Sequence, residues 1–195
     1  MIAHAKKHLA LVFAAFAFIA SAASAAEIEV LWLGHATTRI TSTTGKVIVI
    51  DPFLTTNPKT PTEYRDLGAL GRVDLILVTH GHSDHVADLP ALVRLTSAKV
   101  VAPYEYANNL VAFGLLEGDS VVAMNKSGYV EPLGRGIKIH MVHAEHSSSV
   151  DLAVFGLQGS QPNSPRHIGR SAKMLWIRSS TVRFWITSSS EYGAR

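Results

Sequence analysis

The run VDLILVT at residues 73–79 leads directly into the polar hexapeptide HGHSDH at residues 80–85. A short, near-continuous apolar run between polar segments predicts a strand that is buried on both faces, as in the middle of a parallel sheet. Side chains that follow such a strand are held by the rigid sheet but remain open to solvent, which is typical of functional sites. This stretch therefore predicts an α/β protein with polar chemistry at one edge of its sheet.

Elements of alternating type surround this stretch. Strands are predicted from β-branched and apolar runs, and helices from apolar residues that share one face. The further strands are expected at residues 28–33, 37–41, 46–50, 99–102, 120–124, 136–144 and 150–157, and the helices at 86–95 and 104–113. This alternation predicts the α/β (or α+β) class with a buried sheet. The composition, 47% hydrophobic and 17% charged over 195 residues, excludes an intrinsically disordered protein.

The hexapeptide crowds three imidazoles and one carboxylate into six residues. Nitrogen and oxygen ligands of this kind suit Zn²⁺ and related divalent ions. The chain contains no cysteine, so a metal would be held by His, Asp or Glu. Gly81 permits a tight backbone path, which lets His80 and His82 converge on one ion while Asp84 and His85 turn toward a second position. The alternative, a solvated loop with coincidental histidines, does not account for such dense packing of ligand types.

Four stretches, in this order, carry a resemblance to a known family: WLGHAT at 32–37, VIDPF at 49–53, VTHGHSDH at 78–85 and AEHSS at 144–148. The H-x-H-x-D-H pattern after a buried strand resembles the metallo-β-lactamase fold superfamily. Taken together, the four stretches are similar to a family of metal-dependent hydrolases with lactonase-like and phospholipase-D-like members, over roughly residues 28–156. The resemblance implies an αββα sandwich.

The resemblance also implies a role for each matching residue. His80, His82 and His146 match the three histidines that hold a first metal, and Asp84 and His85 match ligands of a second. A metal-activated water would be the nucleophile, and Asp84 would orient or deprotonate it. Ester, lactone, phosphodiester and amide bonds of a small-molecule substrate are open to such a site. Zn²⁺ is the expected metal, while ligation by His and Asp alone leaves Mn²⁺ and Fe open.

Four other residues near these motifs are weighed separately, and two of them, His35 and Asp51, have two interpretations each. His35 is either a residue that hydrogen-bonds a metal ligand or a structural histidine that bonds a backbone carbonyl. Asp51 either caps the turn before Pro52 or orients a metal-bound histidine. If the strand at 136–144 continues, His143 and His146 point to opposite faces, and the resemblance selects His146. His140 is expected to be a packed strand residue.

The first 26 residues predict a secretory signal peptide. A cationic start that includes Lys6 and Lys7 precedes an apolar stretch of twelve residues, 9–20, which is too short to span a bilayer. Ala23–Ala25 forms the small-x-small pattern of a cleavage site, before Ala26 or Glu27. Export, to a bacterial periplasm, is therefore expected, with no membrane span in the mature chain; an uncleaved N-terminal anchor is the alternative.

Charge divides the remainder of the chain. Residues 27–164 carry a net charge of −4, whereas residues 165–195 carry +5, so the overall +3 describes neither part. The resemblance would also lead to a further strand, an Asp that bridges both metals and a final His, but no Asp follows Asp151 and no His follows His167. We therefore expect a hydrolase-like domain at 27–164 and an atypical basic tail at 165–195, in a sandwich that is incomplete at its C-terminus, truncated or read out of frame.

These observations favour one function over two others. The favoured function is an exported metal-dependent hydrolase, and the second is a non-catalytic remnant that binds a metal without turnover. The third, a nucleic-acid binder that uses the basic tail, is disfavoured because residues 27–164 are net acidic and the tail offers a few aromatic residues but no recognised binding module. The sequence leaves the substrate and the oligomeric state undetermined.

Overall fold

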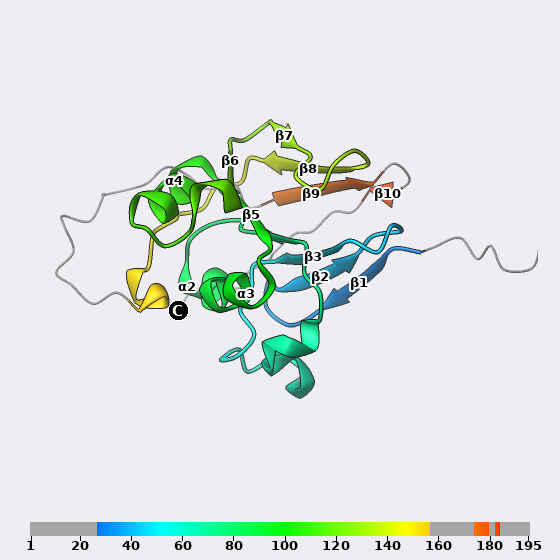
Figure 1. The fold of residues 1–195 in the computed structure, drawn as a ribbon, viewed down its shortest axis with the longest axis horizontal. Helices are drawn as coiled ribbons and strands as arrows, with labels where there is room; N and C mark the ends of the chain where they lie inside the picture. Colours follow the sequence, from blue (N-terminus) through cyan, green and yellow to red (C-terminus); the bar gives the residue numbers. More distant parts are fainter. Residues whose placement is uncertain (1–26, 157–173, 180–181, 184–195) are drawn as a thin grey trace, which may run out of the picture.

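Two β-sheets lie face to face in the computed structural model of this chain, and helices cover the outer face of one of them (Figure 1). The structure describes residues 27–156, 174–179 and 182–183. The expected signal peptide at 1–26 and most of the expected basic tail lie outside these residues.

The first sheet has six strands in sequence order. They are β1 (Glu29–Trp32), β2 (Thr38–Thr41), β3 (Val47–Ile50), β4 (Leu75–Leu77), β5 (Lys99–Pro103) and β6 (Val121–Met124). β1, β2 and β3 are antiparallel to one another, and β3, β4, β5 and β6 are parallel. All six were predicted, and the apolar run at 73–79 supplies β4 in the middle of the parallel part.

The second sheet has four antiparallel strands in the order β10-β9-β8-β7. They are β7 (Tyr129–Val130), β8 (Ile137–Val142), β9 (Met174–Ser179) and β10 (Val182–Arg183). Only β8 was predicted. β9 falls inside the segment 165–195, which showed no strand order in the sequence, and its backbone pairs with β8 so that Ile177 lies opposite Ile139.

Short helical elements connect the strands. The α-helices are α2 (Ser83–Val86), α3 (Leu89–Thr96) and α4 (Tyr104–Ala112), and the 3₁₀ helices are η1 (Thr62–Arg65), η2 (Leu67–Leu70), η3 (Gly118–Ser120) and η4 (Leu152–Phe155). The helix expected at 86–95 is divided, because Pro90 lacks an N–H group and occupies the first turn of α3. No helix among the described residues combines the length and apolarity that crossing a membrane requires.

The strand expected at 150–157 was wrong. Within its described part the chain forms η4, and the Asp151 carboxylate accepts a hydrogen bond from the Ala153 N–H at 3.1 Å, which favours a turn over an extended chain. A short apolar run is compatible with either structure, so its sequence pattern alone did not discriminate.

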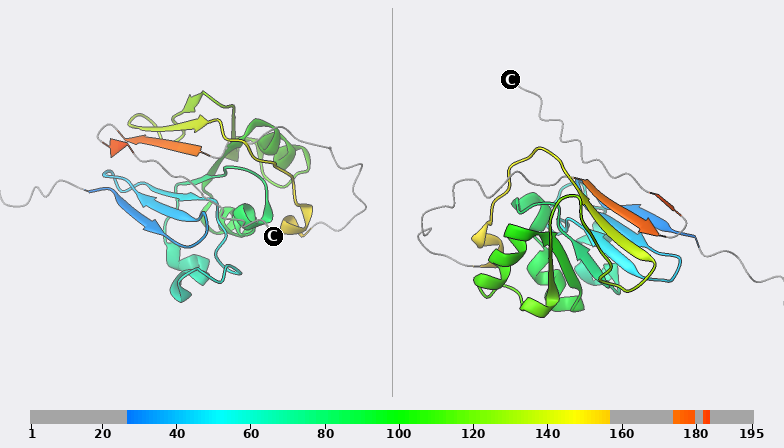
Figure 2. Two further views of the ribbon diagram at one scale, coloured as in Figure 1. Left: turned by 180° about the vertical axis from the view of Figure 1, so that it is seen from behind. Right: turned by 90° about the horizontal axis from the view of Figure 1, so that it is seen from above.

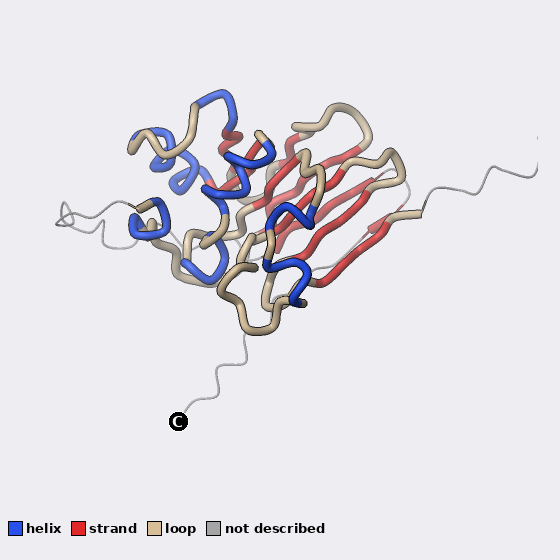
Figure 3. The backbone as a smooth tube through the Cα atoms, turned by 60° about the horizontal axis from the view of Figure 1, so that its bottom comes forward, coloured by secondary structure: helices blue, strands red, loops and turns tan. Residues whose placement is uncertain are grey.

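Two apolar layers form the core, one on each side of the first sheet. Ile76 of β4 packs among side chains of α3 and α4, whereas Leu75 and Leu77 pack against Ile139 and Met141 of the second sheet. β4 is thus buried on both faces, as predicted. Figure 2 and Figure 3 show the resulting helix–sheet–sheet order from other directions, with the helices gathered beside the strands.

The topology brings three polar turns to one edge of the first sheet. Ile50, the last residue of β3, lies opposite both Leu77 at the end of β4 and Thr38 at the start of β2. The turn before β2, Asp51 after β3 and the hexapeptide after β4 therefore meet. In open α/β sheets, ligands bind at the carboxyl ends of the parallel strands, which is where these turns lie.

Candidate metal centre

A first cluster of three histidines lies at this edge: His80, His82 and His146. One ligand atom from each lies within 4.8 Å of the others. His80 is fully buried, and its Nε2 is 3.0 Å from Nδ1 of His82. The ring of His146, from the loop after β8, is centred 4.6 Å from that of His80 and 5.0 Å from that of His82. The structure thus brings together the three residues that the resemblance assigned to a first metal.

Neighbouring hydroxyl groups contact the opposite side of two of these rings. Thr79 Oγ1 lies 3.0 Å from Nδ1 of His80, and Ser147 Oγ lies 3.5 Å from Nε2 of His82. The remaining nitrogens, Nε2 of His80 and Nδ1 of His82, therefore face the centre of the cluster. Hydrogen bonds to the outer nitrogen of a ligand histidine are typical of metal sites, because they fix the tautomer and the ring orientation.

Gly81 allows the loop after β8 to approach the hexapeptide closely. Its N–H donates to Ser148 Oγ at 3.1 Å. A Cβ atom at this position would overlap the Ser149 carbonyl oxygen and lie 2.5 Å from Cε2 of Tyr106. Glycine is therefore required here by the packing around it, and the close approach is what carries His146 to the other two histidines.

A second cluster contains His35, Asp84 and His85. Nε2 of His35 is 3.0 Å from Oδ2 of Asp84, and Nε2 of His85 is 4.0 Å from the same oxygen. Asp84 and His85 were expected to act together. His35 was expected either to support a ligand or to bond a carbonyl, but its imidazole lies among the ligand groups themselves.

Asp51 contacts His85 of the second cluster and fixes the orientation of its ring. Its Oδ2 atom lies 2.8 Å from Nδ1 of His85 and accepts a hydrogen bond from the Thr79 hydroxyl at 2.7 Å, and its Oδ1 atom accepts one from the Thr79 N–H at 2.8 Å. The residue is 1% exposed, so water does not compete for these contacts. With Nδ1 directed to Asp51, His85 presents Nε2 to the cluster. The sequence left two roles open for Asp51, capping of the turn before Pro52 and orientation of a histidine, and this contact with His85 is of the second kind.

The two clusters adjoin each other. The rings of His80 and His85 are centred 4.0 Å apart. The donor set of the two clusters is five imidazoles and one carboxylate. Imidazole and carboxylate in close pairs suit borderline and harder divalent ions, so the residues fit the zinc, manganese or iron expected from the sequence.

Asp88 is a buried carboxylate that the sequence analysis did not single out. It accepts hydrogen bonds from the Leu54 and Thr55 N–H groups and from the Thr55 hydroxyl. These contacts join the loop after β3 to the start of α3. Asp88 directly precedes α3, a position where an aspartate commonly caps the helix. Its side chain makes no capping hydrogen bond, however, and bonds the loop after β3 instead.

Tyr106 of α4 packs beneath the hexapeptide. Burial raises the pKa of its hydroxyl, and the negative charges of Asp151 and Asp51 raise it further. The hydroxyl oxygen has no hydrogen-bond partner among the described residues. The group is therefore neutral at ordinary pH, and its ring rather than its charge supports the loop.

The other two histidines of β8 and its following loop lie outside both clusters. His140 lies in β8 with its ring centred 5.3 Å from that of Tyr129, in line with the packed role predicted for it. β8 ends at Val142, so the alternation of strand faces does not extend to His143. His143 is instead exposed and pairs with Glu145 at 2.8 Å.

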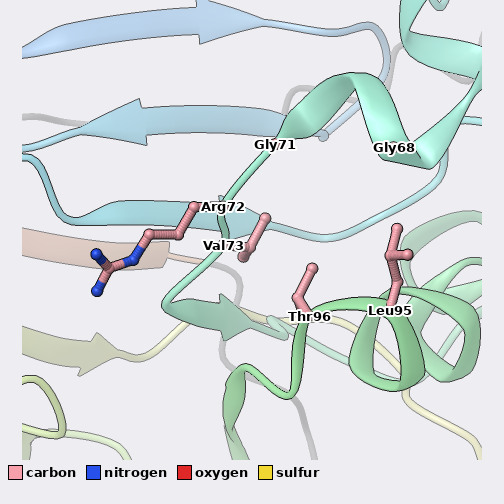
Figure 4. Close-up of a pocket in the computed structure, with 6 residues that line it drawn as sticks. All are labelled: Gly68, Gly71, Arg72, Val73, Leu95 and Thr96. Carbon is pink, nitrogen blue, oxygen red and sulfur yellow. The ribbon is translucent and has the colours of Figure 1, made fainter.

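A separate hollow of about 310 Å³ lies between η2 and α3 (Figure 4). It is lined by Gly68, Gly71, Arg72, Val73, Leu95 and Thr96. Its one charged side chain, Arg72, is hydrogen-bonded to Asp74. No lining residue belongs to either cluster, so the hollow adds no group to the candidate site.

Residues 30–156 match the sequence profile of the metallo-beta-lactamase superfamily, and the chain belongs to that superfamily. A UPF0173 metal-dependent hydrolase of Cupriavidus taiwanensis is 57% identical over 130 residues, which cover 66% of this chain and 46% of the relative. A UPF0173 metal-dependent hydrolase of Methanosarcina mazei is 39% identical over 138 residues, 70% of this chain and 54% of the relative. The chain thus spans about half the length of the curated relatives it matches.

A solved structure shares the fold. Igni18, a metallo hydrolase of the archaeon Ignicoccus hospitalis, superposes with a TM-score of 0.63 at 22% identity, covering 84% of this chain and 61% of the other. At this identity the likeness concerns the fold alone. Together with the superfamily match, it confirms the predicted mixed α/β class and the resemblance drawn from the four sequence stretches.

Proposed function

We propose that this chain is a metal-dependent hydrolase that uses an activated water to cleave an ester, lactone or phosphodiester bond of a small molecule. The observation that carries the proposal is the pair of adjoining clusters, with the rings of His80 and His85 centred 4.0 Å apart. The names of the relatives, metal-dependent hydrolases, support the same class of reaction.

The side chains of the two clusters have two roles, binding of metal ions and transfer of a proton from water. His80, His82 and His146 bind one divalent ion, and Asp84 with His85 binds a second. Ions held there would polarise the scissile bond and lower the pKa of water to about 7. The side chain of Asp84 is 49% exposed, so its carboxylate reaches solvent, where it can orient a water molecule and accept its proton. His35 contacts that carboxylate and restricts its position.

Metal content and hydrolysis measured on the same preparations test this proposal. The chain is loaded with Zn²⁺ and assayed with lactone, phosphodiester and β-lactam substrates. We expect His82→Ala and His146→Ala each to lower metal affinity and turnover by at least about 100-fold, because each removes a ligand. His143→Ala is the matched control, since His143 lies in the same loop as His146 but outside both clusters.

Each remaining outcome has a defined meaning. Turnover that is unaffected by both substitutions would contradict the assignment of the site. Metal binding without turnover on any substrate would favour the second function, a metal-binding protein without catalysis. Because thiolates are absent and imidazoles dominate, we propose Zn²⁺ as the resident ion, and reconstitution of the metal-free chain with Zn²⁺, Mn²⁺ or Fe²⁺ compares the three.

We also propose that the protein is exported. The cationic start, the twelve apolar residues and the small-x-small pattern at Ala23–Ala25 support a cleaved signal peptide. Expression in a bacterium followed by N-terminal sequencing of the periplasmic fraction is expected to give a mature chain that begins at Ala26 or Glu27. A mature chain that still begins at Met1 would contradict cleavage and favour an uncleaved anchor.

A further inference from the structure

We propose that His35 is itself a ligand of the second metal, so that His35 Nε2, Asp84 Oδ2 and His85 Nε2 form a three-donor site. This inference rests on the proposed metal-dependent function, and it assigns to His35 a role that differs from support of Asp84 by hydrogen bonding. The described residues then provide two complete triads of donors, one for each metal.

The distances within the cluster fit direct ligation. His35 Nε2 is 3.0 Å from Asp84 Oδ2, and Asp84 Oδ2 is 4.0 Å from His85 Nε2. Ligand atoms about 2.0 to 2.1 Å from a tetrahedral zinc are separated from one another by about 3.3 Å. The first separation is about 0.3 Å shorter and the second about 0.7 Å longer than this value, so binding of an ion would require side-chain shifts on the order of 1 Å or less. All three ligand atoms lie within 4.8 Å of one another.

The backbone holds the His35 imidazole in this position. His35 has a φ of 52°, in the left-handed region, and follows Gly34 at 100°. A non-glycine residue at positive φ costs roughly 1 kcal/mol or more and persists where its surroundings impose it. The Trp32 indole donates to the His35 carbonyl oxygen at 2.9 Å, and the Thr37 N–H donates to the Gly34 carbonyl oxygen at 3.0 Å. The turn is thereby fixed with the ring directed at Asp84.

Packing of the loop after β3 against this turn adds a second constraint. A Cβ atom on Gly34 would lie 2.9 Å from the Lys59 carbonyl carbon, so the turn and this loop are in close contact. The ring of Phe53 stands edge-on to that of His35 with centroids 6.0 Å apart, and the ring of His85 lies 5.0 Å away on a similar edge contact. The imidazole therefore contacts two rings, which restrict its orientation as a preorganised ligand requires.

Two substitutions separate ligation from support. His35→Ala removes the ring, whereas His35→Gln replaces it with an amide that can still donate a hydrogen bond to Asp84 from nearly the same position but is a poor metal ligand. The number of bound zinc ions and their affinities are measured by mass spectrometry of metal content and by competition with a chelator. His143→Ala serves as the control.

We expect the unsubstituted chain to bind two zinc ions. Both His35 variants are expected to retain the first ion and to bind the second at least about 10-fold more weakly. Full recovery of the second ion in His35→Gln would overturn the proposal in favour of a supporting role, and so would two ions of unchanged affinity in His35→Ala. A chain that binds one ion overturns this inference alone, whereas a chain that binds none also overturns the proposed function.

A measurement on the unsubstituted chain avoids any question of variant folding. Diethylpyrocarbonate modifies accessible imidazole nitrogens, and the side chain of His35 is 34% exposed while that of His143 is 48% exposed. Saturation with zinc is expected to lower modification of His35 at least about 10-fold, because ligation occupies Nε2, and to leave modification of His143 unchanged. Equal modification of His35 with and without zinc would overturn the proposal.

Discussion

Asp51 combines deep burial with a left-handed backbone, at a φ of 46°, and contacts residues on both sides of the metal centre. Its carboxylate bonds Thr79, which contacts His80 of the first cluster, and it bonds His85 of the second. A single buried carboxylate therefore orients histidines in both clusters. These contacts account for the burial and the left-handed backbone of Asp51, although it belongs to neither cluster.

Asp51→Asn tests this role at the scale of one residue. The amide keeps the shape but loses the negative charge that holds the Nδ1 proton of His85, so we expect zinc affinity of the second site to fall about 10- to 100-fold. Competition titration measures it, and Glu145→Gln, which neutralises an exposed carboxylate paired with His143, provides the control. Equal affinities in Asp51→Asn and the unsubstituted chain would contradict the orienting role.

Gly81→Ala tests the close approach of the loop after β8. The added methyl group would meet the Ser149 carbonyl oxygen and the Tyr106 ring, so the loop must move and carry His146 away from its partners. We expect a loss of about 1 to 3 kcal/mol in the free energy of unfolding, measured with urea, together with weaker zinc binding. At Gly118 the nearest atom, Val111 Cγ1, is 3.7 Å from an added Cβ, so Gly118→Ala is the control and should retain zinc affinity.

At the scale of elements, Asp74 connects the beginnings of strands β3 and β4. Its carboxylate accepts hydrogen bonds from the Val47 N–H at 2.9 Å and from Lys46 at 3.2 Å, as well as from Arg72. Burial acts to raise the pKa of this carboxyl, but the hydrogen bonds from Val47, Arg72 and Lys46 outweigh burial and leave the pKa below its ordinary value. The charged form therefore stabilises the register between the two strands.

The pH dependence of unfolding follows from the sign of this shift. Because the pKa is lower in the folded than in the unfolded chain, the contribution is complete above the unfolded value of about 3.9 and is lost as pH falls through the folded value. Asp74→Asn is expected to lower the free energy of unfolding by about 2 kcal/mol at pH 5 to 8, with a smaller difference below about pH 4. Urea unfolding across this range measures it, with exposed Asp119→Asn as the control; a difference that grows toward acid would contradict the assignment.

The elements also show how far sequence patterns extend. Strands β1, β3 to β6 and β8 carry apolar patterns, whereas β2 (TRIT) alternates only weakly. The hexapeptide after β4 identifies most of the first cluster. β7 and β10 are two residues long, too short for any periodicity, and β9 acquires strand structure by pairing with β8. The position of His35 beside Asp84 depends on β2 running antiparallel to β3, a tertiary relation that the local pattern around residues 32–37 does not contain.

At the scale of the molecule, the candidate metal centre lies where connections of the two sheets meet. Its candidate ligands come from the turn between β1 and β2, the hexapeptide after β4 and the loop after β8, so they belong to connections of both sheets. Contacts between these segments include the hydrogen bond from Gly81 to Ser148 and the approach of Ser147 to His82. A metal ion held by side chains from connections of both sheets would therefore stabilise the packing of one sheet on the other.

Metal removal should consequently destabilise the whole domain rather than the site alone. A ligand that binds only the folded state at 100 times its Kd contributes about 2.7 kcal/mol to the free energy of unfolding. We expect chelation to lower the unfolding temperature of the unsubstituted chain by several degrees, about 2–4 °C per kcal/mol, and to affect His82→Ala much less. Differential scanning calorimetry with and without chelator measures both, and His143→Ala should respond as the unsubstituted chain does. Because the ligands join both sheets, one cooperative transition should shift as a unit; a chelator effect equal in His82→Ala would show that the stabilising ion binds elsewhere.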